Sequence, residues 1–126
     1  MKPELIFVYN ANSDLFSSLT DFAHKIISPS TYNCSLCRLT YNNFTVKKDW
    51  KTFIEKLPAK TIFLHKDEFE KFHVESNLPA IFLKENAGLK QLVSKDEIDD
   101  CKSVEDLKDL ITKKLSGYVQ RYHSNI

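Results

Sequence analysis

Glycine is almost absent from this chain, since only Gly88 and Gly117 occur among its 126 residues. Phosphate loops of the type G-x-x-x-x-G-K-[ST] and dinucleotide turns of the type G-x-G-x-x-G need several glycines at short, fixed spacing. Two glycines so far apart satisfy neither pattern. Nucleotide hydrolysis through a phosphate loop is therefore excluded, and the sequence predicts no cofactor.

The chain also lacks a long apolar run and an excess of charge of one sign. Its 18 basic and 17 acidic side chains are interspersed and give a net charge of +1, which excludes nucleic-acid or membrane binding driven by bulk charge. The longest apolar run, Leu5 to Tyr9, is far shorter than the roughly 20 residues of a membrane helix. Glu4 and Asn10 bracket this run too closely for a secretory signal. We expect a cytoplasmic protein without nucleic-acid or membrane partners.

What the chain does contain is enough apolar material for one domain. A hydrophobic content of 42% over 126 residues can form an ordinary core, and no repeat, low-complexity tract or linker interrupts the sequence. The prediction is a single domain covering residues 1–126. Three cysteines in a reducing compartment argue against a framework of structural disulfides.

Hydrophobic periodicity predicts alternating strands and helices. Runs of apolar or alternating residues predict strands at about 4–9 and 61–65 and a hairpin of strands at 80–84 and 89–93. Helical spacing predicts a helix from Ser13 to before Pro29, a helix ending before Pro58 and a short helix at 67–72, the first two ended by prolines. Capping serines predict two further helices, which start at Ser94 and Ser103. Residues 30–44 remain open, because "LCRLTY" alternates like a strand while Leu36 and Leu39 share a helical face. The element order indicates an α/β protein.

The segment "NCSLC" carries the strongest chemical signal, a CxxC motif formed by Cys34 and Cys37. In a redox pair, Cys34 is the expected nucleophile, because the first cysteine of a CxxC is usually the exposed one, and Cys37 resolves the mixed disulfide. Alternatively, both thiols are small buried side chains in a binding or regulatory module. The motif alone does not decide between them.

A metal site is the third interpretation of the same cysteines. Structural zinc needs four ligands, and the motif supplies two. His24, near the end of the first predicted helix, is the best additional ligand, although a solvent-exposed histidine near a helix C-terminus is the simpler interpretation. His65, His73 and Cys101 are the other available side chains, and Cys101 is predicted to pack in the core. We expect less than stoichiometric zinc in the purified protein.

The order of elements is similar to that of thioredoxins, and "VESNLPAIFLKENAGLKQLVS" resembles their segment in which a cis-proline precedes a hairpin and the final helix. The resemblance implies an α/β thioredoxin-like fold, with a central mixed sheet of about four to five strands flanked by helices. It also implies a cis bond between Leu78 and Pro79, substrate binding beside these two residues, and thiol-disulfide exchange at Cys34 and Cys37 with a protein dithiol or disulfide partner. The segment "TYNCSLCRLTY" is similar to a TYxCxLCxLTY segment in a group of small bacterial proteins.

The motif departs from the thioredoxin pattern in two respects. Tyr32, Asn33, Ser35 and Leu36 replace the familiar Trp before the first cysteine and the Gly-Pro between the two. The residues before the motif, "IISPSTYN", form a poor strand because of Pro29. If "LIFVY" is instead the strand beside Pro79, the catalytic position falls on residues 10–13, which contain no thiol, and the redox centre is lost or moved.

Overall fold

A computed structural model describes the backbone of residues 3–10, 34–40, 47–85 and 88–124, with side chains up to Gly117. Its elements are β1 (Glu4–Val8), α2 (Ser35–Thr40), α3 (Lys48–Glu55), β2 (Lys60–Leu64), α4 (Lys66–Phe69), the 3-10 turn η3 (Glu70–Phe72), β3 (Ala80–Glu85), β4 (Gly88–Val93), α5 (Lys95–Asp99) and α6 (Val104–Ser124). The helix predicted from Ser13 lies outside the described residues.

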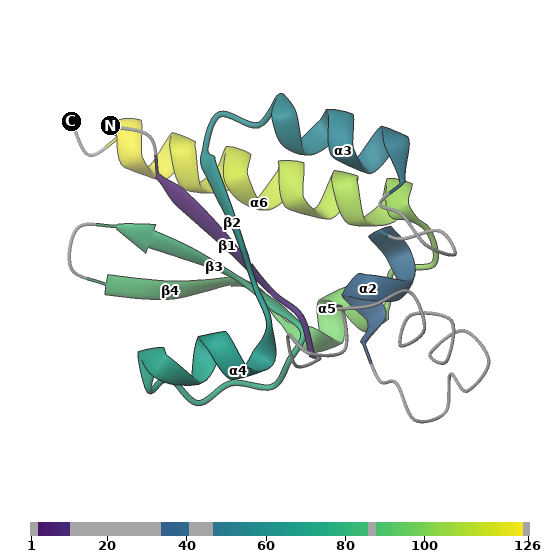
Figure 1. The fold of residues 1–126 in the computed structure, drawn as a ribbon. Helices are drawn as coiled ribbons and strands as arrows, with labels where there is room; N and C mark the ends of the chain where they lie inside the picture. Colours follow the sequence, from purple (N-terminus) through teal and green to yellow (C-terminus); the bar gives the residue numbers. More distant parts are fainter. Residues whose placement is uncertain (1–2, 11–33, 41–46, 86–87, 125–126) are drawn as a thin grey trace.

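The four strands form one mixed sheet in the order β2-β1-β3-β4. β1 is parallel to β2 and antiparallel to β3, and β3 and β4 form the predicted hairpin. Figure 1 shows α3 and α6 together on one side of this sheet and α4 on the other. The coarse prediction of an α/β domain with a mixed sheet flanked by helices is therefore confirmed.

Alternate residues of β1 point to opposite faces of the sheet, as the period of a strand requires. Leu5 and Phe7 enter the major core, which lies on the side of α3 and α6, whereas Ile6 and Val8 enter the minor core under α4. The other buried members of the major core are Tyr9, Cys34, Leu36, Cys37, Leu39, Trp50, Ile81, Leu83, Leu92, Val93, Ile98, Cys101, Val104, Leu107, Ile111 and Leu115. Phe69, Ala80 and Phe82 complete the minor core.

The helix starts predicted at the two serines differ in detail. At α5, Glu97 N–H donates to Ser94 Oγ over 3.2 Å, and Ser94 N–H donates to Glu97 Oε1 over 3.0 Å, which is the reciprocal capping box. At α6, Asp106 N–H donates to Ser103 Oγ, but the Asp106 carboxylate accepts from Lys102 N–H instead of Ser103 N–H. The second capping box is therefore only half formed.

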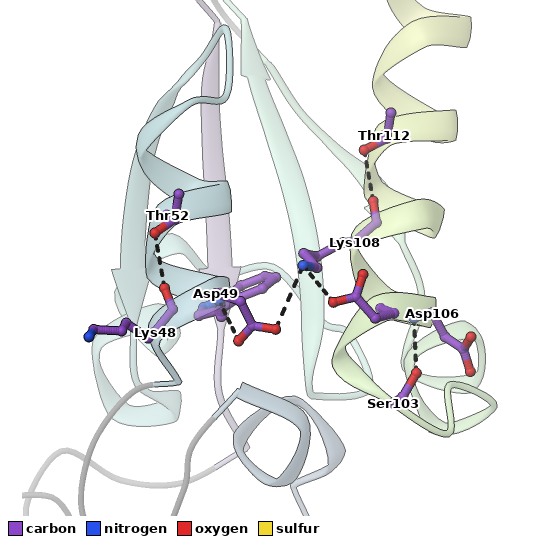
Figure 2. Close-up of polar contacts among 9 residues, drawn as sticks. Lys48, Asp49, Thr52, Ser103, Asp106, Lys108 and Thr112 are labelled. Atoms are coloured by element: carbon purple, nitrogen blue, oxygen red, sulfur yellow. Dashed lines mark hydrogen bonds and ion pairs between the residues drawn. The ribbon is translucent and has the colours of Figure 1, made fainter.

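An exposed ion-pair network joins α3 to α6 across the outside of the major core. Figure 2 shows Lys108 of α6 pointing toward Asp49 of α3, and Lys108 Nζ lies 3.8 Å from Asp49 and 2.7 Å from Glu105 of its own helix. The hydrogen bond to Glu105 raises the pKa of Lys108. Exposed pairs of this kind stabilise little, so α3 and α6 are held together mainly by the buried core that contains Trp50 and Leu107.

Candidate redox site

The segment that the sequence left open between strand and helix is helical from Ser35 to Thr40. Leu36, Leu39 and Thr40 are buried, and Arg38 is exposed. A strand would place Leu36 and Arg38 on the same face, whereas a helix separates them and groups residues three and four apart. The side chains therefore follow the helical pattern, with Cys34 immediately before the first turn.

One helical turn brings the two cysteines of the motif together. The sulfur atoms of Cys34 and Cys37 lie at disulfide-bonding distance, and their Cα atoms are 5.4 Å apart, within the range that a disulfide requires. Cys37 N–H also points to Cys34 Sγ over 3.3 Å. The geometry thus allows an intramolecular disulfide without movement of the helix.

The expectation that Cys34 is the exposed cysteine is wrong. Cys34 and Cys37 are each only 4% exposed and belong to the major core. The reason is the packing of α2, whose neighbours are α5 and α6. The sequence left this segment open between strand and helix, and it could not show what covers the start of α2.

The third cysteine lies in the same core. Cys101, directly after α5, is buried as predicted, and its Sγ points to the carbonyl oxygen of Glu97 over 3.5 Å. Burial, with the nearby carboxylates of Asp106 and Asp100, raises the pKa of the Cys101 thiol. Burial and the raised pKa both disfavour the thiolate of Cys101, which is the reactive form.

A polar network that sequence reasoning missed reaches into the motif itself. The hydroxyl of Ser35 donates to Asp99 Oδ1 over 2.5 Å, and Lys95 Nζ donates to Asp99 Oδ2 over 2.6 Å. Partial burial of Asp99 opposes its ionisation, but the hydrogen bonds from Lys95 and Ser35 outweigh this effect and lower the pKa of Asp99. Asp99 is thus an ionised anchor between α5 and the start of α2.

The bond between Leu78 and Pro79 is cis, as predicted, and Pro79 directly precedes β3. Val8 pairs with Ala80, so Pro79 lies beside the carboxyl end of β1. The strand next to Pro79 is therefore "LIFVY", so the position that the resemblance to thioredoxins makes catalytic falls on residues 10–13, which contain no thiol. The Cys34–Cys37 pair is not at that position, and the chain reaches Cys34 only after residues 11–33, which are outside the described residues. Figure 1 shows α2 at the end of the sheet where β1 ends and β3 begins.

A polar cavity of about 280 Å³ lies next to the segment before Pro79. Its lining consists of Glu75, Ser76, Asn77, Gln91, Ser94, Lys95 and Asp96. Gln91 Nε2 donates to Ser76 Oγ over 3.0 Å and thereby ties β4 to the segment before β3. Lys95 contributes both to this cavity and to the Asp99 network.

In the described part of the chain, no further side chains join Cys34 and Cys37 as possible zinc ligands. Within residues 3–10, 34–40, 47–85 and 88–117, no three side chains of His, Cys, Asp or Glu come together as a metal site. His24 lies outside the described residues. His65 Nδ1 is 2.7 Å from Glu68 Oε1 at the start of α4, and His73 is exposed.

Comparison of the chain with protein-family models, curated proteins and solved structures finds no match. The helices in the described part of the chain are each too short or too polar to cross a membrane. The functional argument therefore rests on the residues and their arrangement.

Proposed function

We propose that this chain is a thioredoxin-like thiol redox protein or redox sensor, in which Cys34 and Cys37 alternate between dithiol and disulfide. The observation that carries the proposal is that the two sulfurs lie at bonding distance at the start of α2. The thioredoxin-like fold is supported by the order of elements and by the proline that precedes the hairpin β3–β4 and the final helix. A reducing cytoplasm would keep the pair in the dithiol form.

The chemistry needs one two-electron oxidant, either a disulfide or a peroxide. The Cys34 thiolate, toward which the Cys37 N–H points, attacks one sulfur of a partner disulfide, a mixed disulfide forms, and the other partner sulfur leaves as a thiolate. The Cys37 thiolate then attacks Cys34 Sγ, the Cys34–Cys37 bond forms, and the second partner sulfur leaves. With a peroxide, Cys34 becomes a sulfenic acid, and attack by Cys37 releases water. An external dithiol returns two electrons to close the cycle.

The burial of both sulfurs favours a sensor over a reductase with broad access to protein substrates. Each of the two cysteines is 4% exposed, so a peroxide or a small dithiol reaches the pair more readily than a folded protein does. Formation of the bond constrains the first turn of α2, which packs against α5 and α6. Oxidation thereby changes the rigidity of one helix on the major core.

The direct test follows the disulfide by mass spectrometry. The reduced protein is treated with hydrogen peroxide or oxidised dithiothreitol, and remaining thiols are blocked with N-ethylmaleimide. We expect two thiols to be lost together in the wild type and in Cys101→Ser, and no intramolecular bond in Cys34→Ser or Cys37→Ser. In exchange assays, Cys34→Ser should abolish disulfide reduction, and Cys37→Ser should trap mixed disulfides.

A non-catalytic thioredoxin-fold interaction domain is the second candidate, and the same burial of the sulfurs favours it. This candidate gains if, in the native reduced protein, Cys34 reacts with maleimide no faster than Cys101 and oxidants form no bond between Cys34 and Cys37. Elemental analysis on the same samples separates the zinc interpretation. One zinc per chain, lost in both Cys34→Ser and Cys37→Ser, would replace the redox proposal.

A further inference from the structure

The hydrogen bond between Ser35 and Asp99 joins two residues that are 64 positions apart in the chain. Ser35 is one of the two residues between the cysteines, so this bond reaches into the CxxC turn itself. Ser35 is 7% exposed, and its hydroxyl has the carboxylate of Asp99 as an ionised acceptor. Hydrogen bonds to ionised acceptors are stronger than those between neutral groups.

We infer that Asp99 is a positioning residue for the thiol pair, which through Ser35 holds the turn in the geometry that joins Cys34 to Cys37. This inference rests on the proposed function, because it concerns the balance between dithiol and disulfide. It adds a residue outside the motif to the redox site. It also assigns a role to the spacer residue Ser35.

Asp99 can position the turn because its own side chain is held in place. Lys95 Nζ binds the second carboxylate oxygen of Asp99, so that the first oxygen faces Ser35. α5 is itself held by the capping box of Ser94 and by Ile98, which is fully buried in the major core. The start of α2 is thus tied to a short, well-anchored helix instead of depending on its own six residues.

The expected consequence concerns ring closure. Holding two reacting groups in place raises their effective concentration, so a fixed turn favours the disulfide over the dithiol. Loss of the hydrogen bond should shift the equilibrium with dithiothreitol about tenfold toward the dithiol, in line with the worth of a bond to a charged group. A tenfold shift corresponds to a rise in reduction potential of about 30 mV.

Four variants separate the hydrogen bond from the charge of Asp99. Ser35→Ala removes the donor and keeps the charge, and Asp99→Ala removes both acceptor and charge. Asp99→Asn removes the charge but keeps a carbonyl oxygen that can accept from Ser35. Asp96→Ala, on an exposed position of the same helix, is the matched control.

The experiment titrates each protein in reduced and oxidised dithiothreitol, blocks free thiols with N-ethylmaleimide, and records the thermal midpoint of both redox forms. We expect tenfold shifts in Ser35→Ala and Asp99→Ala, a smaller shift in Asp99→Asn and none in Asp96→Ala. Equal shifts in Asp99→Ala and Asp99→Asn, with none in Ser35→Ala, would mean that only the charge acts and would overturn the inference. Wild-type equilibria in all variants would also overturn it while leaving the proposed function intact, whereas a wild type that forms no Cys34–Cys37 bond would remove both.

Discussion

The two faces of the sheet are built very differently. The major core receives side chains from α2, α3, α5 and α6 and contains Cys34, Cys37 and Cys101, whereas the minor core is covered in the described structure by α4 and contains no cysteine. Exposed aromatic rings lie against both cores: Phe63 stacks on Phe7 of the major core, and Phe72 stacks on Phe69 of the minor core. The thiol pair therefore belongs to the larger packed region, and the smaller region does not contact it directly through its buried side chains.

The strongest test of this difference uses two adjacent residues of β1. Leu5 and Ile6 are both fully or almost fully buried but enter opposite cores. Leu5→Ala should lower the free energy of unfolding by about 3–5 kcal/mol, and Ile6→Ala by about 2–3 kcal/mol, because the cost of a cavity depends on how well its surroundings can collapse. Urea unfolding of both variants gives the comparison. An equal or larger loss in Ile6→Ala would mean that the minor core is packed as tightly as the major one.

A smaller effect is expected from opening the Cys34–Cys37 bond. A ring of four residues restricts the unfolded chain little, so reduction should lower the free energy of unfolding by about 2 kcal/mol. Urea unfolding with and without dithiothreitol measures this difference. Cys101→Ser is the control, since its oxidised and reduced forms should differ as those of the wild type do. Equal free energies of unfolding for the oxidised and reduced wild type would show that closing the Cys34–Cys37 bond does not change the conformational freedom of the turn.

The helix starts on the major side allow a finer test. Ser94→Ala breaks the complete capping box of α5 and should cost about 1 kcal/mol of unfolding free energy. Ser103→Ala removes the half-formed cap of α6 and should cost less, because this helix of 21 residues has many other contacts. Thermal or urea unfolding decides the order. A larger loss in Ser103→Ala would place the weak point of the major side at α6.

The smallest effects concern acid sensitivity on the two sides. Backbone and ring hydrogen bonds from His65 lower the pKa of Glu68 on the minor side, and Lys114 with the Ser94 backbone lowers the pKa of Glu97 on the major side. A carboxylate with a lowered folded pKa stabilises the fold above its unfolded pKa, and this contribution is lost as the pH falls through the folded value. We expect stability to fall below about pH 5 and each of Glu68→Gln and Glu97→Gln to flatten that fall. A variant with the wild-type pH profile would show that its carboxylate is not involved.

Local patterns were sufficient to predict most of the described elements. The strands, the hairpin and the capping box at Ser94 follow from alternation, turn residues and a spacing of three, all of which act within a few residues. The secondary structure of segment 30–44 could not be predicted, because the six residues of α2 make less than two helical turns. Over so short a stretch, helical spacing and strand alternation give similar patterns. Its helical state was decided by what Leu36 and Leu39 pack against.

The sequence predicted which cysteines and which proline form the candidate site, but not what surrounds them. The motif and the proline are visible in the sequence, and the proline is cis and directly precedes β3, as predicted, whereas the place of the motif in the fold was left open. The burial of Cys34 depends on α5 and α6, and the bond between Ser35 and Asp99 spans 64 positions. Neither leaves a local pattern, because a serine in a CxxC spacer and an aspartate at the end of a short helix each have ordinary explanations of their own.

The central position of β1 has a consequence for how the chain is made. β1 is translated before both of its neighbours, β2 at residues 60–64 and β3 at residues 80–85. At the usual rates of synthesis, the ribosome takes on the order of several seconds to supply those neighbours, and during that time the apolar residues of the nascent strand have no sheet to join. Both cores also contain residues of β3, so neither can close before β3 has left the ribosome. A truncated translation product that stops before Pro79 would carry its most apolar segment unprotected, as a substrate for chaperones or proteases.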